Sequence, residues 1–192
     1  MKEFFITGGA GFIGINTINY ILKKKIGRII VYDNFSVTNY KKFKKNFSKI
    51  KIIKGDILDK KKLFKSLKKN YTVIHLAANS DISSGYSNPL KDININLLGM
   101  TNLLESMRLK GNKEIIFTSG SGVYGDTKDS SKVDENFDVS RPISIYGSTK
   151  LGSESLLSAY SYFYNINTTI LRPCNIVGKY MTHGVIHDLI IK

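Results

Sequence analysis

Tyr146 and Lys150 are the residues of this chain whose types and spacing best fit acid–base chemistry. They stand four residues apart in "SIYGSTKLGSE", so on a helix their side chains lie on one face, next to each other. A phenol with a pKa of about 10 is a poor base at neutral pH, and a neighbouring ammonium lowers that pKa by stabilising the phenolate. The pair predicts a general acid/base for alcohol oxidation, although a chain rich in tyrosine and lysine also contains such pairs by chance.

A second candidate is the glycine-rich stretch "FTSGSGVYGD", residues 117–126, which follows a short apolar run. It carries three hydroxyl groups, those of Thr118, Ser119 and Ser121. Loops that follow buried strands often carry binding and catalytic residues. The residues alone leave open whether this stretch is a flexible turn or whether one hydroxyl takes part in the chemistry.

A phosphate cradle is predicted near the start of the chain, in "FFITGGAGFIG". Gly8, Gly11 and Gly14 lie between the first predicted strand and the first predicted helix, the context that a dinucleotide fingerprint needs. The first glycine permits the turn, the second lets a pyrophosphate approach the backbone, and the third lets helix and strand pack closely. The helix N-terminus adds free N–H groups and a partial positive charge. A glycine-rich turn without a ligand is the simpler alternative.

Two acidic residues follow the next two predicted strands. Asp33, in "VYDNF", lies 19 positions after Gly14, where a carboxylate accepts hydrogen bonds from the ribose hydroxyls of adenosine. Because that carboxylate repels a 2′-phosphate, NAD is favoured over NADP as the cofactor. Asp56, in "GDILD", is placed to reach the adenine edge, but an N-cap of the following helix explains it nearly as well.

The elements that must position these residues alternate along the chain, with short β-branched and aromatic runs between longer amphipathic ones. Strands are predicted near residues 3–7, 28–32, 50–53, 72–76, 113–117 and 167–171, and helices near 12–24, 39–47, 59–69, 90–109 and 145–164. The strands are continuous apolar runs such as "RIIVY" and "EIIFT", as expected where both faces of a sheet are buried. The predicted fold class is α/β, a doubly wound parallel sheet (Rossmann fold).

The composition fits one globular domain in a reducing compartment. The 192 residues are 42% hydrophobic, and no stretch is apolar for long enough to span a membrane or resembles a secretory signal. The one cysteine, Cys174, has no partner for an internal disulfide, and no Cys/His cluster has the spacing of a zinc site, so no metal is expected. These features predict a cytoplasmic protein.

The formal net charge of +14 would suit a nucleic-acid partner or an anionic membrane. The lysines, however, concentrate in "KKK" at 23–25, "KKFKK" at 41–45 and "DKKKLFKSLKK" at 59–69, where apolar residues keep helical spacing and lysines fill the other face. They are interpreted as solvated helix faces, so neither nucleic acid nor a membrane is predicted as a partner. Attraction of an anionic substrate is a milder use of the same charge.

In its motifs the sequence resembles the extended short-chain dehydrogenase/reductases, and within them the NAD-dependent sugar-nucleotide epimerase/dehydratases. The matching motifs keep the family's order and spacing: "TGGAGFIG" (7–14), "VYDN" (31–34), "GDILD" (55–59), "HLAA" (75–78), "NLLG" (96–99), "VYG" (123–125), "YGSTK" (146–150) and "LRPCNIVG" (171–178). Two further stretches, "HLAANSD" at 75–81 and "MTHGVIHDLI" at 181–190, are most similar to the UDP-glucose 4-epimerases of archaea and bacteria.

The resemblance implies NAD as the cofactor and a role for each matching residue. Tyr146 would be the catalytic acid/base, Lys150 would hold the nicotinamide ribose, and Asn175 would contact the nucleotide-sugar substrate. The glycine bend and helix start would bind the pyrophosphate, residues 33–34 the ribose and residues 56–57 the adenine. The implied cofactor-binding residues are Gly8, Gly11, Phe12, Ile13, Gly14, Asp33, Asn34, Asp56, Ile57, Ala77, Ala78, Asn96, Tyr146 and Lys150.

The sequence departs from the family's pattern at Gly120. Counted back from the tyrosine of "VYG", this glycine stands where the family has a Ser or Thr that hydrogen-bonds the sugar hydroxyl being oxidised. Ser119 or Ser121 would then replace that hydroxyl as a catalytic residue, or Tyr146 would orient the substrate alone. Ser119 is slightly favoured, because it lies nearer the rigid end of the strand.

The expected function is NAD-dependent epimerisation at C4 of a UDP-sugar (UDP-glucose/UDP-galactose) by transient oxidation to a 4-keto intermediate. Similar dehydratases carry an Asp–Glu pair directly after the missing hydroxyl, where this chain has Ser121 and Gly122, so dehydration is disfavoured. A decarboxylase, dehydratase or reductase of the same fold, and a non-catalytic NAD-binding protein, stay open as alternatives.

The character of the sequence changes after Pro173. Residues 1–172 are predicted to form the NAD-binding Rossmann domain, and residues 173–192 the beginning of a small substrate-binding domain that is largely absent from the chain. These residues alone are therefore expected to bind NAD but to turn over sugar poorly. Relatives dimerise through the helices that correspond to 90–109 and 145–164, so a homodimer is a further expectation.

Overall fold

A sheet of six parallel strands forms the centre of the fold in the computed structural model, which describes residues 1–79, 84–127, 132–139, 141–181 and 189. The strands are β1 (Lys2–Thr7), β2 (Gly27–Asp33), β3 (Lys51–Lys54), β4 (Thr72–His75), β5 (Glu114–Thr118) and β6 (Asn167–Leu171). Their order in the sheet is β3-β2-β1-β4-β5-β6, the order of the doubly wound Rossmann fold. All six predicted strands are present, with their ends shifted by no more than one residue.

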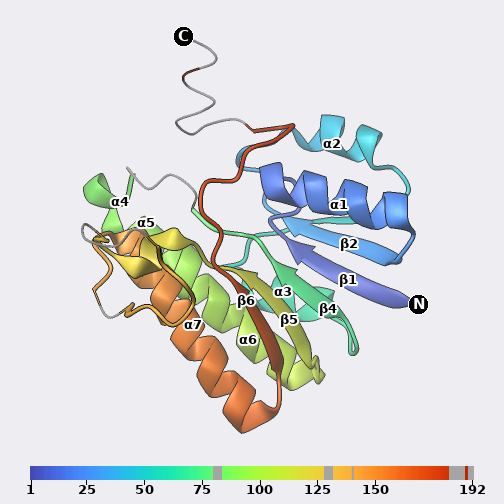
Figure 1. Cartoon of the computed structure of the whole chain (residues 1–192). Helices are drawn as coiled ribbons and strands as arrows, with labels where there is room; N and C mark the ends of the chain where they lie inside the picture. The colour runs from blue at the N-terminus through green and yellow to red at the C-terminus, as the bar shows by residue number, and fades with distance from the viewer. Residues whose placement is uncertain (80–83, 128–131, 140, 182–188, 190–192) are drawn as a thin grey trace.

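Helices cover both faces of this sheet. α1 and α2 lie on one face, and α3, α6 and α7 lie on the other (Figure 1). The helices are α1 (Phe12–Lys24), α2 (Tyr40–Asn46), α3 (Lys60–Ser66), α4 (Ser84–Ser87), α5 (Pro89–Asp92), α6 (Gly99–Lys110) and α7 (Ile145–Tyr164), with a π-helical segment η1 (Ile93–Leu98) and a 3-10 turn η2 (Ser121–Tyr124). Among the described residues, no helix is both long and apolar enough to cross a membrane.

The predicted helices at 12–24 and 145–164 are confirmed with the same bounds, and the one at 39–47 is confirmed with one residue fewer at each end, whereas the remaining two differ more. The helix predicted at 59–69 ends at Ser66, because Leu67 takes an extended backbone with a ψ of 137° and packs into the core. The helix predicted at 90–109 is divided into α5, η1 and α6. α4 and η2 were not predicted, since four residues are too few to show a helical period.

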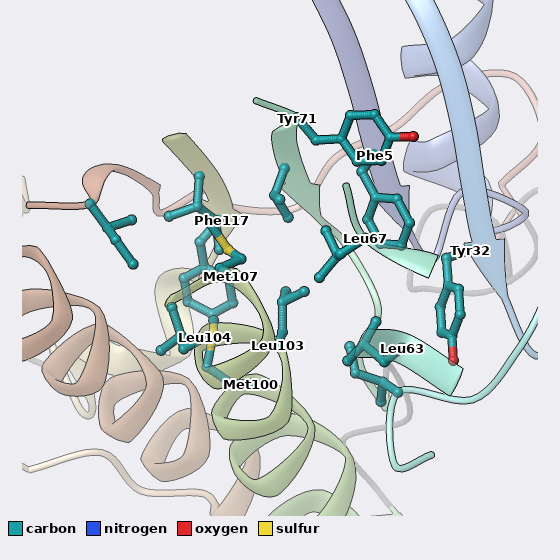
Figure 2. Packing of buried hydrophobic residues seen from close by; sticks show 14 of the residues in the cluster. Phe5, Tyr32, Leu63, Leu67, Tyr71, Met100, Leu103, Leu104, Met107 and Phe117 are labelled. Carbon is teal, nitrogen blue, oxygen red and sulfur yellow. The ribbon is translucent and has the colours of Figure 1, made fainter. Parts of the chain in front are cut away.

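The sheet separates two hydrophobic cores. Phe5 of β1 belongs to the core beneath α3, α6 and α7, whereas its neighbours Phe4 and Ile6 belong to the core beneath α1 and α2. This division arises because successive side chains of a strand point to opposite faces. Figure 2 shows the first core, in which the rings of Phe5 and Tyr71 stack with their centroids 5.9 Å apart. Packing on both faces therefore fixes the central strands, and with them the positions of their carboxyl ends.

Candidate active site

The glycine bend lies where the carboxyl ends of β1 and β4 meet. Gly8 has a φ of +68°, and a Cβ atom there would lie 2.5 Å from the backbone nitrogen of Ala77. Glycine alone tolerates both that φ and so close an approach of a second strand. Gly14 is similarly constrained, because its Cβ would lie 2.6 Å from the carbonyl oxygen of Gly8. The bend and α1 therefore pack as the dinucleotide fingerprint predicts.

The N-terminus of α1 has the properties of an anion site. Gly11 is the N-cap residue and makes no side-chain cap, and Phe12 and Ile13 follow it in the first turn. A Cβ on Gly11 would approach only the carbonyl oxygen of Gly8, at 3.4 Å, so its lack of a side chain leaves open space over the bend. Because the first N–H groups of a helix lack intrahelical partners, this cradle fits a pyrophosphate group.

Asp33 ends β2 beside the bend. Its Oδ2 accepts a hydrogen bond from the backbone N of Ala10 at 3.0 Å, and its Oδ1 accepts one from the backbone N of Phe35 at 2.7 Å. Burial raises the pKa of Asp33, and these two hydrogen bonds act in the opposite direction. Each carboxylate oxygen keeps a second lone-pair position, so the fixed side chain is able to accept hydrogen bonds from a ribose.

Asn34, which follows β2, and Asp56, which lies shortly after β3, are hydrogen-bonded to each other. Asn34 Nδ2 donates to Asp56 Oδ2 at 2.9 Å. Asp56 Oδ1 accepts from the backbone N of Leu58 at 2.8 Å, within its own turn. The alternative that Asp56 caps the next helix is wrong. Asp59 caps α3 by accepting from the backbone N of Lys62.

The other predicted cofactor residues at strand ends differ in exposure. The side chain of Ile57 is buried, and a Cβ on Gly99 would lie 2.8 Å from its Cγ2. Ala77 and Ala78 follow β4 and are partly exposed, and the Ala77 backbone N donates to Thr7 Oγ1 at 3.4 Å. Ala77 therefore borders the bend and Ala78 follows it in the chain, whereas Ile57 belongs to the core.

Tyr146 and Lys150 lie in the first two turns of α7, at the carboxyl end of β5. Ser144 caps this helix by accepting a hydrogen bond from the backbone N of Gly147 at 3.0 Å. Lys150 Nζ donates to the carbonyl oxygen of Thr118 at 2.8 Å and lies 5.5 Å from the centroid of the Tyr146 ring. The structure therefore brings the predicted pair together, and the Tyr146 hydroxyl makes no hydrogen bond within the described residues.

The pKa values of this pair correct one expectation. Burial raises the pKa of Tyr146, and the negative charge of Asp92 raises it further. Burial lowers the pKa of Lys150 to about 8, against the opposing effects of Asp92 and Glu154. The expected lowering of the Tyr146 pKa by Lys150 is wrong for the chain alone. The lysine ammonium is held on the Thr118 carbonyl, and burial and the Asp92 charge both disfavour the phenolate of Tyr146.

Position 120 faces the Tyr146 hydroxyl, because a Cβ on Gly120 would lie 3.9 Å from both the OH and Cε1 of Tyr146. The two neighbouring serines differ from each other in exposure. Ser119 is 4% exposed and its Oγ is buried without a hydrogen-bond partner, whereas Ser121 is exposed at the start of η2. In the described parts of the chain neither serine is hydrogen-bonded to Tyr146, so which hydroxyl assists catalysis stays a prediction.

Asn96 anchors a buried polar network in η1. Its Oδ1 accepts from the backbone N of Asn79 at 2.9 Å, and its Nδ2 donates to Thr149 Oγ1 at 3.1 Å. Ser153 Oγ donates to the Asn96 carbonyl oxygen at 3.1 Å. Only Asn96 was predicted as a site residue, because its partners lie 17 to 57 positions away in the chain and local spacing does not show which of them it contacts.

Asn175 is exposed on the segment that follows β6 and is not hydrogen-bonded to another described residue. This segment runs along α1, where Asn16 Nδ2 donates to the carbonyl oxygen of Lys179 at 2.8 Å. An open cavity of about 440 Å³ lies between them, lined by Phe12, Ile13, Asn16, Thr17, Tyr20, Ile176, Val177 and Gly178. The quoted stretches at 75–81 and 181–190 extend outside the described residues at 80–81, 182–188 and 190.

The fold and the glycine bend are those of the NAD-binding proteins of the extended short-chain dehydrogenase/reductase class. Residues 4–192 match the NAD dependent epimerase/dehydratase family, and the chain belongs to that family. NAD is its cofactor, and the glycine bend and Asp33 fit that cofactor.

Relatives in this family carry different names. A putative UDP-glucose 4-epimerase of Methanocaldococcus jannaschii is 36% identical over 180 residues, which cover 91% of this chain and 56% of that protein. A dTDP-D-glucose 4,6-dehydratase of Dictyostelium discoideum is 31% identical over 194 residues, covering 93% of this chain and 44% of that protein. The crystal structure of UDP-glucose 4-epimerase from Brucella ovis in complex with NAD has a TM-score of 0.81 and 30% identity, covering 90% of this chain and 51% of that one. The chain thus spans about half the length of these relatives.

Proposed function

We propose that this protein epimerises C4 of a UDP-sugar, interconverting UDP-glucose and UDP-galactose through a 4-keto sugar. The observation that carries this proposal is the Tyr146 hydroxyl, which makes no hydrogen bond within the described residues and faces open space at Gly120. Lys150 lies one helical turn further along α7. The similarity to proteins named UDP-glucose 4-epimerase supports C4 as the reacting carbon.

Tyr146 is the acid/base of the proposed reaction. NAD, when bound, supplies a hydride acceptor and donor for the sugar carbon. The Tyr146 oxygen takes the proton of the 4-hydroxyl as that group becomes a carbonyl, and it gives the proton back when the carbonyl is reduced on its other face. Because burial raises the pKa of Tyr146, its base form is reached at higher pH than that of a free phenol, and we expect turnover to increase as pH rises toward that pKa.

Lys150 provides the positive charge of the site. Its pKa of about 8 leaves most of the side chain protonated at neutral pH, and the carbonyl of Thr118 fixes Nζ at the end of β5. In that position it would hold the nicotinamide ribose. Asp33 with Asn34 would hold the other ribose, and the bend at 8–14 the pyrophosphate.

The residues after Gly120 favour epimerisation over dehydration. Removal of water from the sugar needs an acid and a base beyond the tyrosine, and Ser121 and Gly122 carry no carboxylate. We therefore place this chain with the epimerases of the family, although a dehydratase is among its relatives.

The same proposal divides the chain into two regions. Residues 1–172 would bind NAD, since β6 ends at Leu171 and completes the sheet. Residues 173–192 would begin the region that binds the nucleotide-sugar, with Asn175 as a contact. The exposure of Asn175 supports this, because its side chain is free to meet a ligand.

An assay of three substrates side by side tests the proposed activity. The purified protein is given UDP-glucose, UDP-N-acetylglucosamine or UDP-glucuronate without added cofactor, and the products are separated by chromatography. We expect UDP-galactose from UDP-glucose, without net NADH, because the hydride returns to the sugar. Release of CO2 or water, or accumulation of NADH, would instead identify a decarboxylase, a dehydratase or an oxidoreductase.

The second candidate is a non-catalytic NAD-binding protein, which the missing side chain at Gly120 favours. Tyr146→Phe separates the two functions, because it removes the proton-carrying oxygen and keeps the ring. We expect the variant to lose turnover and to bind NAD with the affinity of the parent protein in a calorimetric titration. Equal product formation by both proteins would exclude Tyr146 as the acid/base.

We also propose a homodimer formed through α6 and α7. Leu109 on α6, and Tyr162 and Phe163 on α7, are exposed by 56%, 82% and 71% of their surface. Burial of such side chains at an interface is favourable, at about 25 cal/mol per Å². Light scattering after size-exclusion chromatography should give twice the chain mass, and Phe163→Asp should reduce it to one.

A further inference from the structure

Asp92, the last residue of α5, is a fully buried carboxylate close to the reactive pair. Its Oδ1 accepts a hydrogen bond from Asn79 Nδ2 at 2.7 Å. Its Oδ2 is buried and has no hydrogen-bond partner. A Cβ on Gly85 would lie 2.5 Å from this Oδ2 and 3.8 Å from Cβ of Ile145, so the free oxygen lies near the start of α7.

A buried carboxylate with an unsatisfied oxygen is costly. Leaving a buried polar group without a partner costs about 1–3 kcal/mol, and more when the group is charged. No cation forms an ion pair with Asp92 among the described residues to offset that cost. Buried charges of this kind concentrate at functional sites, where their field acts on nearby groups.

A chain of hydrogen bonds connects this carboxylate to the helix turn that carries the reactive side chains. Asn79 binds both Asp92, through Nδ2, and Asn96, through its backbone N. Asn96 Nδ2 donates to Thr149 Oγ1 at 3.1 Å, and that hydroxyl donates to the carbonyl oxygen of Tyr146 at 2.9 Å. Thr149 directly precedes Lys150, so the network ends in the turn of α7 that joins Tyr146 and Lys150.

We propose that Asp92 is a positioning residue for the Tyr146–Lys150 pair, acting through this network and through its fixed negative charge. The charge opposes formation of the phenolate on Tyr146 and helps Lys150 to keep its proton in spite of burial. The Asp92 charge thereby raises the pH at which Tyr146 becomes a phenolate, and it keeps Lys150 protonated. The kinetic part of this inference rests on the proposed function, and the electrostatic part does not.

Few other charged groups act on the pair within the described residues. Glu154, on α7, raises the pKa of Lys150, as Asp92 does. His75, on β4, has its pKa lowered to about 3 by burial and by Lys150, and is neutral near pH 7. Asp92 is the group whose charge raises the pKa of both Tyr146 and Lys150, which makes its removal informative.

Asp92→Asn tests the inference, because it removes the charge and keeps the shape. The protein is labelled with ¹³C at the tyrosine ring carbon that bears the oxygen, and the Tyr146 signal is assigned from its loss in Tyr146→Phe. We expect the Tyr146 titration to move to lower pH in Asp92→Asn. The acidic limb of the kcat profile should move in the same direction.

Asp59→Asn is the matched control, since it removes an exposed carboxylate at the cap of α3 by the same chemical change and should leave the Tyr146 titration in place. Asp92→Ser, also neutral and smaller, replaces Asp92→Asn if the latter does not fold. An unchanged Tyr146 midpoint in a folded neutral variant overturns the inference, whether or not the protein turns over sugar. A shifted midpoint in a protein that transforms no UDP-sugar supports the inference and refutes the proposed function.

Discussion

At the scale of single residues, the direction of each Cβ decides which side chain reaches the chemistry. Gly120 faces the Tyr146 hydroxyl, whereas the hydroxyl of Ser119 is buried and Ser121 is exposed. The φ of Gly120 is 173°, an extended conformation that any residue adopts. The backbone at position 120 therefore permits a serine, and the hydroxyl is missing because the residue there is a glycine.

Gly120→Ser is expected to increase turnover. Its Cβ meets nothing closer than 3.9 Å, and its hydroxyl would lie beside Tyr146, where it is able to orient the sugar hydroxyl. One such hydrogen bond, worth about 1.4 kcal/mol in the transition state, raises kcat/KM about tenfold. Gly122→Ser is the control, because its Cβ would lie 3.8 Å from Cδ1 of the Tyr146 ring, away from the hydroxyl. A similar gain in both variants would contradict the prediction.

His75 should make the stability of the fold sensitive to pH. It is buried, is hydrogen-bonded to Thr7 Oγ1 at 2.6 Å, and has its pKa lowered to about 3 by burial and the Lys150 charge. The unfolded chain protonates it near its ordinary pKa of about 6.5, so the unfolded state binds one more proton between these values. Stability therefore falls as pH decreases from about 6.5 toward 3, by up to about 1.4 kcal/mol per unit from this group.

Urea unfolding at pH 7, 6 and 5 measures this dependence. His75→Asn keeps a polar side chain beside Thr7 and cannot titrate, so its free energy of unfolding should fall less steeply over the same range. Parallel curves for the two proteins would show that His75 is not the group responsible.

At the scale of the elements, the site is built where helices begin and strands end. α1 begins at the bend after β1, and α7 begins beside the loop after β5. The π-helical η1 lies between α5 and α6, and Asp92, directly before η1, and Asn96, within it, are both hydrogen-bonded to Asn79. π-helical turns occur often at functional sites, because they re-aim side chains without ending the helix.

Gly8→Ala and Gly11→Ala should separate folding from cofactor binding. An alanine at position 8 takes on an unfavourable positive φ and collides with the backbone at Ala77, costing about 2 kcal/mol or more of stability. An alanine at position 11 meets Gly8 O at 3.4 Å and costs less than about 1 kcal/mol. Both should weaken NAD binding in calorimetric titrations, because both narrow the pyrophosphate cradle. If Gly11→Ala binds NAD as tightly as the parent, the cradle is misplaced.

At the scale of the whole molecule, the sheet supports two cores. Arg172, at the β6 edge of the sheet, binds segments that lie far apart in the chain. The guanidinium donates to Glu154 Oε2 through Nη2 at 2.6 Å, and through Nη1 to Tyr124 OH at 3.4 Å and the Glu135 carbonyl oxygen at 3.2 Å. These contacts join α7, η2 and the loop that contains Glu135 to the residue after β6. The hydrogen bond to Glu154 raises the pKa of Arg172, so the guanidinium stays charged.

Glu154→Gln should destabilise the fold by about 3 kcal/mol, because it leaves a largely buried guanidinium without its counter-charge. The matched control is Glu105→Gln, at a more exposed pair with Arg108, for which a loss of no more than about 1 kcal/mol is expected. Urea unfolding of the three proteins at pH 7 gives both differences. Equal losses of unfolding free energy in the two variants would show that the Glu154–Arg172 pair stabilises the fold no more than the Glu105–Arg108 pair.

By itself the sequence determined the strands, the long helices, the glycine bend and the Tyr146–Lys150 pair, because apolar periodicity and glycine spacing are local properties of the chain. Tertiary structure decided what surrounds that pair. Asp92 is 54 positions from Tyr146 and belongs to no motif, yet its buried charge acts on the phenol. The expected direction of the Tyr146 pKa was wrong for the same reason, since burial and through-space charge depend on how distant segments pack.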